Sequence, residues 1–277
     1  MVFQGLGPIF VRKAAMSGLA FAFHRMWMAA LLYAVLSFAT GRPITRQALR
    51  VSAPGGLFFA FNIAVFFISV QRTSVANATV IGALQPAVLM LIGARMFGEH
   101  TSLREVFWTA VSFIGAAVVV FGSSSAETGD LFGDFLAFVA MLGFAGYFAA
   151  SKRARETLGA FEYQSALSLV AFVALVPAVV LASTDLAAPR PSSWAWIVGM
   201  VLLPGTGHLM TNYAHAYVRL SVMSVLTLLS PGLSSLAAWL LLDERLVLTQ
   251  VVGMVVTVVA LAIMVRPPRH VRRAHPG

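Results

Sequence analysis

The sequence predicts an all-α integral membrane protein with ten transmembrane helices, arranged as two inverted repeats of five helices and with a short first helix. Three observations carry this prediction. Of the 277 residues, 59% are apolar and only 10% are charged, and the mean hydropathy is +0.87. A soluble domain carries about 25% charged residues, so this chain lacks the polar side chains that would cover a surface facing water. The apolar residues also fall in long runs, and one apolar pattern returns 145 residues later.

Ten apolar runs mark the expected helices. A helix that crosses roughly 30 Å of hydrocarbon needs about 20 mainly apolar residues, because unpaired backbone groups are costly in lipid. The expected spans are 2–17, which is short, 20–39, 51–70, 75–97, 105–122, 131–150, 161–182, 193–213, 221–242 and 246–265. Short connections such as "GEHTSLRE" and "SKRARETLG" separate them. None of these connections is long enough to hold a soluble domain.

Basic residues in the connections indicate the orientation, because Lys and Arg concentrate on the cytoplasmic side. If both termini are cytoplasmic, twelve basic residues lie inside and five outside. The inner twelve are Arg42, Arg46, Arg50, Arg104, Lys152, Arg153, Arg155, Arg219, Arg266, Arg269, Arg272 and Arg273; the outer five are Arg12, Lys13, Arg72, Arg190 and Arg245. Arginine at 17 of the 19 basic positions suggests a GC-rich bacterial genome, which would make this the bacterial cytoplasmic membrane.

The net charge of +9 does not require a nucleic acid as partner. The charge lies in short connections and in the tail 267–277, where it encodes topology and can anchor the chain beside anionic lipid. An RNA-binding or protein-binding tail is the alternative. The partners expected are therefore a small-molecule substrate and membrane lipid, and a homodimer is left open.

The recurring pattern indicates a duplication. "LQPAVLMLIGARMFGEH" and "LSPGLSSLAAWLLLDER" place Pro86 and Pro231, and also Glu99 and Glu244, 145 residues apart. The expected repeats are 1–122 and 131–266, joined by a linker at 123–130. Because each repeat has five spans, an odd number, the second enters the membrane inverted. Inverted repeats are typical of secondary transporters, whose solute site lies at the repeat interface near the midplane.

Both copies also resemble the EamA family of the drug/metabolite transporter superfamily. The resemblance rests on the proline, the apolar and small residues, the acidic ending and the Gly-bearing last helix, and on "FAFHRMWMAALL" with Arg25 as the second helix. It implies a metabolite transporter and leaves the substrate open among amino acids, other metabolites and drugs. The start "MVFQGLGPIFVRK" departs from the family pattern. Either the native chain begins about ten residues upstream of Met1, or the first helix is short.

Motifs for other functions are absent from the sequence. The two lysines, Lys13 and Lys152, lie in no GxxxxGK[ST] loop, which excludes ATP hydrolysis by this chain. No HExxH or GxGD motif occurs, and "GSSS" is not a nucleophile elbow, so we expect no enzymatic activity. With no cysteine and no placeable ligand cluster, neither a metal nor another cofactor is predicted. Transport driven by a gradient, or facilitated diffusion, remains.

The densest polar group inside a span is "PGTGHLMTNYAH". His208 and Asn212 are four residues apart and share one helix face. Pro204, Gly205 and Gly207 precede them and predict a broken helix whose free peptide groups face a substrate. The alternative is that both polar side chains bond neighbouring helices. His208 could also titrate near neutral pH and couple transport to protons.

Three more amides and a tyrosine are substrate-binding candidates, because a polar group inside a span faces either a cavity or another helix. Asn62, Asn77 and Gln85 can hydrogen-bond a polar or zwitterionic solute, and Asn77 and Gln85 share a face. Tyr147 offers a hydroxyl and a flat ring. Interhelical bonding and aromatic packing are the respective alternatives.

The remaining candidates are structural or gating residues. Pro86 and Pro231 should shape their helices, and Gly98, Gly115 and Gly253 should let neighbours approach closely. The carboxylates Glu99 and Glu244 lie at helix ends, where they can stay hydrated, and Arg95 lies one turn before Glu99, within pairing distance. Arg25 either extends to the interface or binds an anionic carboxylate.

These observations predict a permease that moves a small, amino acid-like or amphipathic metabolite by alternating access, with export favoured. No carboxylate lies near the middle of any span, so proton antiport through a deep carboxylate has no candidate. The alternative function is a non-transporting membrane scaffold or regulatory subunit.

Overall fold

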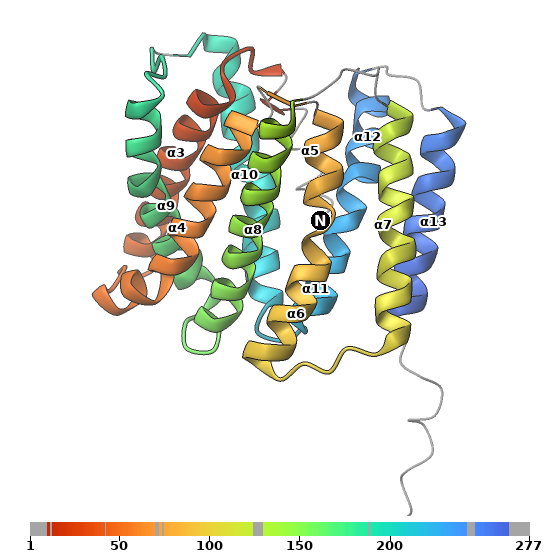
Figure 1. The fold of residues 1–277 in the computed structure, drawn as a ribbon. Helices are drawn as coiled ribbons and strands as arrows, with labels where there is room; N and C mark the ends of the chain where they lie inside the picture. Colours follow the sequence, from red (N-terminus) through yellow and green to blue (C-terminus); the bar gives the residue numbers. More distant parts are fainter. Residues whose placement is uncertain are drawn as a thin grey trace, which may run out of the picture.

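The computed structural model describes residues 10–11, 13–41, 43–69, 72–73, 75–123, 130–187, 189–242 and 247–265. Within these ranges the chain is helical and contains no strand. The helices are α3 (Gly18–Ala39), α4 (Arg46–Ser69), α5 (Val75–Gly82), α6 (Gln85–Phe97), α7 (Leu103–Ser123), α8 (Leu131–Ala154), α9 (Ala160–Leu181), α10 (Pro191–Ala214), α11 (Leu220–Leu226), the 3₁₀ turn η1 (Thr227–Leu229), α12 (Ser230–Leu242) and α13 (Leu248–Val265). They stand upright beside one another as a bundle (Figure 1).

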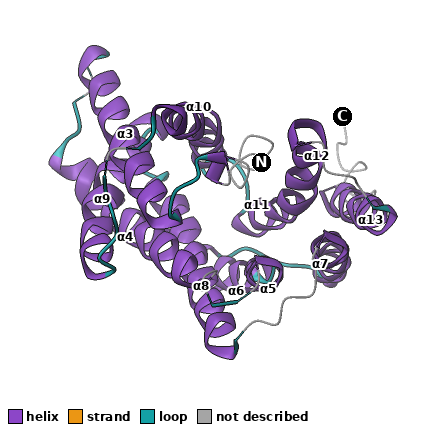
Figure 2. Ribbon diagram, turned by 90° about the horizontal axis from the view of Figure 1, so that it is seen from above, coloured by secondary structure: helices purple, strands orange, loops and turns teal. Residues whose placement is uncertain are grey.

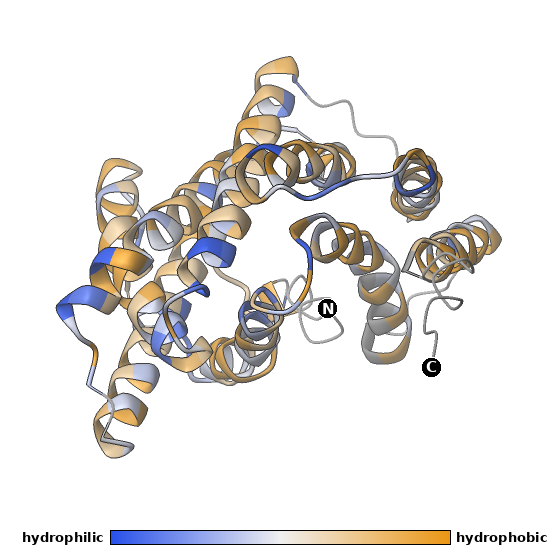
Figure 3. Cartoon of the chain, turned by 90° about the horizontal axis from the view of Figure 1, so that it is seen from below, coloured by the Kyte–Doolittle hydropathy of each residue, from blue (hydrophilic) through white to orange (hydrophobic). Residues whose placement is uncertain are grey.

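The chain is a multi-pass membrane protein by the length and composition of these helices. Six segments are long and apolar enough to cross a membrane: Gly18–Ala39, Arg46–Phe66, Val80–Phe97, Leu103–Phe121, Leu131–Ala154 and Ala160–Leu181. Leu220–Leu233 and Leu248–Met264 are shorter apolar helices. Seen from below, the ribbons are mainly hydrophobic, and hydrophilic segments gather at the connections (Figure 3). The expected first span, 2–17, and the tail 267–277 lie largely or wholly outside the described residues.

Helix bounds in the two halves of the chain repeat with the spacing of the sequence pattern. The helices α4 and α10 begin and end 145 residues apart, and so do α6 and α12. The most extensive contacts join helices of different halves, namely α4 with α8 and α9, α3 with α9, and α7 with α13. Figure 2 shows α3, α4 and α9 at one side and α7, α12 and α13 at the other. The halves therefore do not fold as separate bundles.

Two spans that the sequence predicted to be continuous, 75–97 and 221–242, are each broken near the middle. Ala83 and Leu84 separate α5 from α6, and their amides bond to carbonyls three residues back, at Val80 and Ile81. The 3₁₀ turn η1 separates α11 from α12. Each break lies just before a proline, Pro86 or Pro231, with one residue between them. A proline at this position interrupts the helix because it has no amide hydrogen and its ring clashes with the carbonyl four residues earlier.

The span 193–213 shows the opposite difference, because the predicted break at Pro204 is wrong. The helix α10 runs without interruption through Pro204, Gly205 and Gly207. Two hydroxyls bond back along the same helix, since Thr206 donates to Leu202 O at 2.5 Å and Thr211 donates to Gly207 O at 2.9 Å. A proline and two glycines therefore do not interrupt this helix.

Gly115 and Gly253 hold α7 against α13, as expected from their positions. A Cβ atom added to Gly253 would lie 2.6 Å from Gly115 O, and one added to Gly115 would lie 2.9 Å from Gly253 O. Thr257 at the same crossing donates to Gly253 O at 2.8 Å. Only residues without a side chain permit this approach, because both obstacles are backbone atoms that cannot rotate away.

Replacing Gly253 by Val should force α7 and α13 apart. We expect a loss of about 1–3 kcal/mol of stability, as for overpacking in a core. The measurement is the thermal unfolding temperature of the protein purified in detergent. Gly159→Ala is the matched control, because a Cβ there meets nothing within 4 Å. An unchanged unfolding temperature for Gly253→Val would contradict the close crossing.

Candidate functional site

A cavity of about 320 Å³ lies where the two broken helices meet. Its wall includes Gly82 and Gln85 at the α5–α6 break and Thr227 and Ser230 at the α11–α12 break. The helices α4 and α8 complete it, the former through Asn62. The cavity is therefore shared between the two halves of the chain, at the level where both helices are interrupted.

The cavity walls are mainly apolar and carry no charged residue among those described. Phe66 and Phe144 contribute aromatic rings, and Met141 contributes a flexible thioether. The polar groups are the amides of Asn62 and Gln85 and the hydroxyls of Thr227 and Ser230. Such a site is suited to a largely apolar molecule that carries a few hydrogen-bonding groups.

Gln85 is the polar group most available to a ligand. Its side chain is only 2% exposed, and its Nε2 atom forms no hydrogen bond with any described residue. A buried amide left without a partner costs about 1–3 kcal/mol. Since the chain offers no partner within the described ranges, Gln85 can donate to an acceptor on a bound molecule.

Asn62 lines the same cavity but is already engaged on one side. Its Nδ2 atom donates to Ala140 O at 2.8 Å and so joins α4 to α8. Both alternatives raised by the sequence therefore hold for this residue, which packs between helices and also faces the cavity. Asn77 belongs to α5, but its side chain lies outside the described residues.

Helix ends add to the electrostatics of the cavity. The helices α6 and α12 both begin at the breaks, and Gln85 and Ser230 are their first residues. A helix carries a partial positive charge at its amino end, so both helices favour an acceptor or a negative group at the cavity. Broken helices in secondary transporters use this feature to hold anionic substrate groups.

Tyr147 and Asn212 do not line the cavity. The Tyr147 hydroxyl donates to Asn212 Oδ1 at 3.1 Å, and Asn212 Nδ2 donates to Gln164 Oε1 at 2.7 Å. This chain of hydrogen bonds joins α8, α10 and α9, and Asn212 is fully buried. Sequence reasoning missed Gln164, although an amide inside the apolar span 161–182 is the same signal that identified Asn62.

His208 also lies apart from the large cavity. Its ring packs edge-on against Phe59, with 5.3 Å between centroids, and near Tyr147 at 6.2 Å. With Arg25 and Gly205 it lines a second, much smaller cavity of about 20 Å³. The predicted polar strip on α10 therefore exists, but it faces helices α3, α4, α8 and α9 rather than the main cavity.

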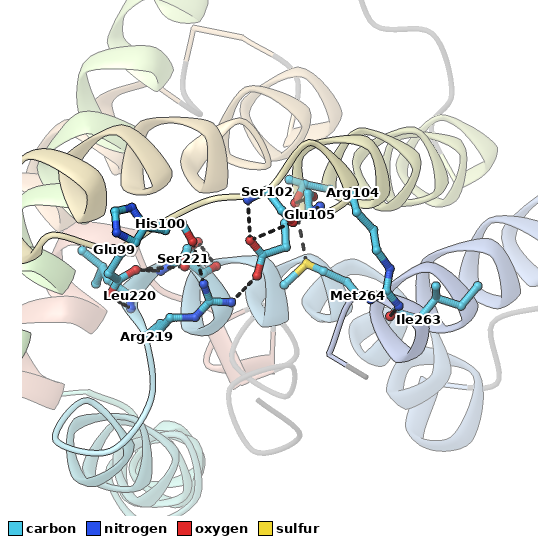
Figure 4. A network of polar contacts seen from close by, with 12 residues as sticks. Glu99, His100, Ser102, Arg104, Glu105, Arg219, Leu220, Ser221, Ile263 and Met264 are labelled. Atoms are coloured by element: carbon cyan, nitrogen blue, oxygen red, sulfur yellow. Dashed lines mark hydrogen bonds and ion pairs between the residues drawn. The ribbon is translucent and has the colours of Figure 1, made fainter. Parts of the chain in front are cut away.

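At the lower end of the bundle in Figure 1, Glu99 binds the start of α11. Its carboxylate accepts hydrogen bonds from Leu220 N at 2.5 Å, Ser221 N at 3.0 Å and Ser221 Oγ at 2.9 Å. Lys152 Nζ lies 3.4 Å from the same carboxylate. Figure 4 shows the contacts of Glu99 with Leu220 and Ser221 beside the ion pair between Arg219 and Glu105. The connection after α6 is thereby attached to the helix that leads into η1 and the cavity wall.

Two sequence-based expectations about Glu99 are wrong. The residue is not hydrated, because its exposed fraction is 8%. Nor does it pair with Arg95, which is exposed and forms no ion pair within the described part of the chain. The αL conformation of Gly98 turns the chain after α6, so the carboxylate points to α11 instead of along its own helix. Glu244 lies outside the described residues.

The contacts of Glu99 alter its titration. Burial would raise the pKa of the Glu99 carboxyl, but hydrogen bonds from the Ser221 and Leu220 amides and the Ser221 hydroxyl, together with Lys152, lower the pKa below its ordinary value. The charged form is thus the one that the folded protein stabilises.

Comparisons with known proteins agree with this architecture. The sequence profile of the EamA-like transporter family matches residues 1–121 and again residues 131–266. An uncharacterized transporter from Archaeoglobus fulgidus is 25% identical over 256 residues, which cover 91% of this chain and 88% of the relative. A crystal structure of a protein with 15% sequence identity superposes with a TM-score of 0.80, covering 95% of this chain and 93% of that one. At this identity the likeness establishes a shared fold.

Glu99→Gln should make the protein less stable at neutral pH and less sensitive to acid. Because the pKa of Glu99 is lower in the folded than in the unfolded protein, its charge stabilises the fold above the unfolded pKa, and this contribution disappears as the pH falls through the folded pKa. We expect a loss of about 1–3 kcal/mol near pH 7. Unfolding temperatures measured from pH 7 down to pH 2 should therefore stay apart above about pH 4.5, the unfolded pKa, and converge only as the pH falls below it. Glu156→Gln, which removes an exposed carboxylate in the connection between α8 and α9, is the control. Curves for native protein and Glu99→Gln that stay parallel over the whole pH range would refute the assignment.

Proposed function

The chain belongs to the EamA-like transporter family, and from this premise we propose that the cavity at the two helix breaks binds the transported solute. The protein would then be a secondary transporter, most simply an exporter, in a bacterial cytoplasmic membrane. The observation that carries the proposal is that both halves of the chain place an interrupted helix at one cavity. Irregular backbone at membrane depth is tolerated where it is enclosed by protein or lines a cavity.

The chemistry of the cavity favours a small amphipathic or amino acid-like solute. A volume of about 320 Å³ lies at the lower end of the range for small-molecule pockets. The rings of Phe66 and Phe144 suit an apolar side chain, and Gln85 suits a carbonyl or carboxylate oxygen. The amino ends of α6 and α12 strengthen the preference for an acceptor at the same level.

Alternating access would require the contacts at the Glu99 end to break and re-form. Glu99 and Arg219 connect the segment between α6 and α7 to the start of α11. Because α11 continues directly into η1, separation of these contacts would move one wall of the cavity. The lower end of Figure 1, where α8 ends in Lys152 and Arg153 and α4 begins at Arg46, would be the cytoplasmic side, with ten spans and both termini inside.

Filling the cavity should abolish transport without damaging the fold. Gly82 lines the cavity, and a Cβ built on it meets nothing within 4 Å, so Gly82→Phe places a ring in open space. The metabolites in the medium of cells producing Gly82→Phe, native protein or the surface control Gly159→Phe should be compared at equal protein abundance. A compound enriched with the native protein and the control, but not with Gly82→Phe, would identify the solute class.

The opposite outcome has a defined meaning. If no compound distinguishes the three proteins in either export or uptake assays, the transporter reading of this cavity fails. A non-transporting scaffold or regulatory subunit would then be favoured. Since the chain has no cysteine, a single Cys introduced at Asn62 reports directly whether water-soluble reagents reach the cavity.

Gln85→Leu should separate a ligand-binding role from a packing role. Removing an amide that has no partner in the described structure should leave the unfolding temperature unchanged or raise it. If Gln85 binds the solute, half-saturation of transport should need about tenfold more solute. Asn62→Leu is the matched comparison, because it removes the bond to Ala140 and should lower the unfolding temperature. Transport that is unaffected in Gln85→Leu would remove this residue from the site.

A further inference from the structure

Arg25 has an unbalanced positive charge within the bundle. It is the eighth residue of α3, about 10 Å from the start of that helix at 1.5 Å per residue. The residue is half-buried and its side chain points inward, with Cζ 5.8 Å from the centre of the Phe59 ring on α4. It therefore does not extend to the membrane interface, which was one of the two expectations from the sequence.

No described residue pairs with this guanidinium. Arg25 forms no hydrogen bond or ion pair within the described ranges, and the described wall of the small cavity beside it contains no carboxylate. The cation–π contact with Phe59 offsets only part of the cost of placing the charge there, because such a contact contributes about 0.5–2 kcal/mol. Arginine cannot lose its proton in a protein, so the charge persists. An unpaired charge in a membrane interior is costly and is normally matched by a counter-charge.

The polar groups around the small cavity can donate hydrogen bonds, apart from Gln164, whose Oε1 already accepts from Asn212 and whose Nε2 donates to Ser168 Oγ at 3.4 Å. His208 presents an Nδ1 atom that has no partner in the described structure. Tyr33 and Ser168 contribute hydroxyls to the same wall, from α3 and α9. A guanidinium, an imidazole and two hydroxyls that converge without an acidic residue form a site for a negative ligand.

The size of the space defines that ligand further. A volume of about 20 Å³ for water-sized probes holds a single water molecule or a monatomic ion, and little else. The small cavity shares no wall residue with the solute cavity. The ring of Tyr147 contacts both walls, because it stacks on Phe144 of the solute cavity at 5.6 Å and packs against Phe59 of the small cavity at 4.9 Å between ring centres.

We propose that Arg25, His208, Tyr33 and Ser168 bind one halide-sized monovalent anion, such as chloride. The anion neutralises Arg25 and joins helix α3 of the first half of the chain to α9 and α10 of the second. Its role is independent of the solute, so the site stands or falls separately from the proposed transport function. A single water in the cavity would leave the charge unmatched.

The test compares the thermal stability of the purified protein in chloride and in gluconate, which is too large for the cavity, at equal ionic strength. Native protein should unfold about 5 °C higher in saturating chloride than in gluconate, with a saturable dependence on chloride concentration. Arg25→Gln should abolish the difference, and His208→Gln should shift half-saturation to higher chloride. Arg95→Gln, which removes an exposed arginine, should behave as the native protein does.

A second measurement covers the case in which Arg25→Gln does not fold. Crystals of the native protein grown in bromide should give an anomalous scattering peak beside the Arg25 guanidinium and the His208 ring. Equal stability in chloride and gluconate, a chloride effect that persists in Arg25→Gln, or bromide crystals without that peak would each overturn the proposal.

Discussion

Backbone groups in a membrane must find their partners within the protein, and this constraint governs the whole structure. It forces long helices wherever the chain faces lipid, and it permits interruption only where other helices or a cavity enclose the peptide groups. Both interruptions in the described chain, before Pro86 and before Pro231, lie against the same cavity. Each break helps to enclose the cavity in which the other break is tolerated. The need to satisfy backbone groups within the protein therefore accounts for the helices and for the position of the cavity.

The same requirement explains why distant connections are tied to the cavity. The helix α11 has only seven residues, so its start at the membrane surface and its end at the cavity are about 10 Å apart at 1.5 Å per residue. A short helix with an unsatisfied amino end would be marginal alone. The Glu99 carboxylate accepts hydrogen bonds from two amides at the start of α11, and Lys152 neutralises its charge. Any change at this surface contact is therefore passed to η1 without an intervening flexible segment.

The sequence predicted the membrane class, the repeat spacing and the two cavity amides, because these depend on composition and on distances along one helix. It did not predict which side chains Tyr147, His208 and Asn212 would contact. Helical periodicity places His208 and Asn212 on one face of α10 but does not say which neighbour that face meets, and the partner of Asn212 proved to be Gln164 on α9. The prediction that Glu99 would be hydrated was wrong for the same reason. Its position at a helix end suggested contact with water, but its carboxylate contacts the start of α11. The break in α10 was overpredicted because a proline weakens a helix without always interrupting it, and Pro54 and Pro177 likewise lie inside continuous helices.

The duplication preserved backbone shape more faithfully than side-chain chemistry. Prolines 145 residues apart follow the break in each half, yet the residue before them is an amide in Gln85 and a hydroxyl in Ser230. The position matching Asn62 by the same spacing is Gly207, and the position matching Arg25 is Val170. A cavity built by two related halves therefore presents different groups on its two sides, with Gln85 on one and Ser230 on the other. Under the proposed function, the shared backbone shape would serve the exchange of two similar states, whereas recognition of the solute would depend on the positions where the two copies no longer match.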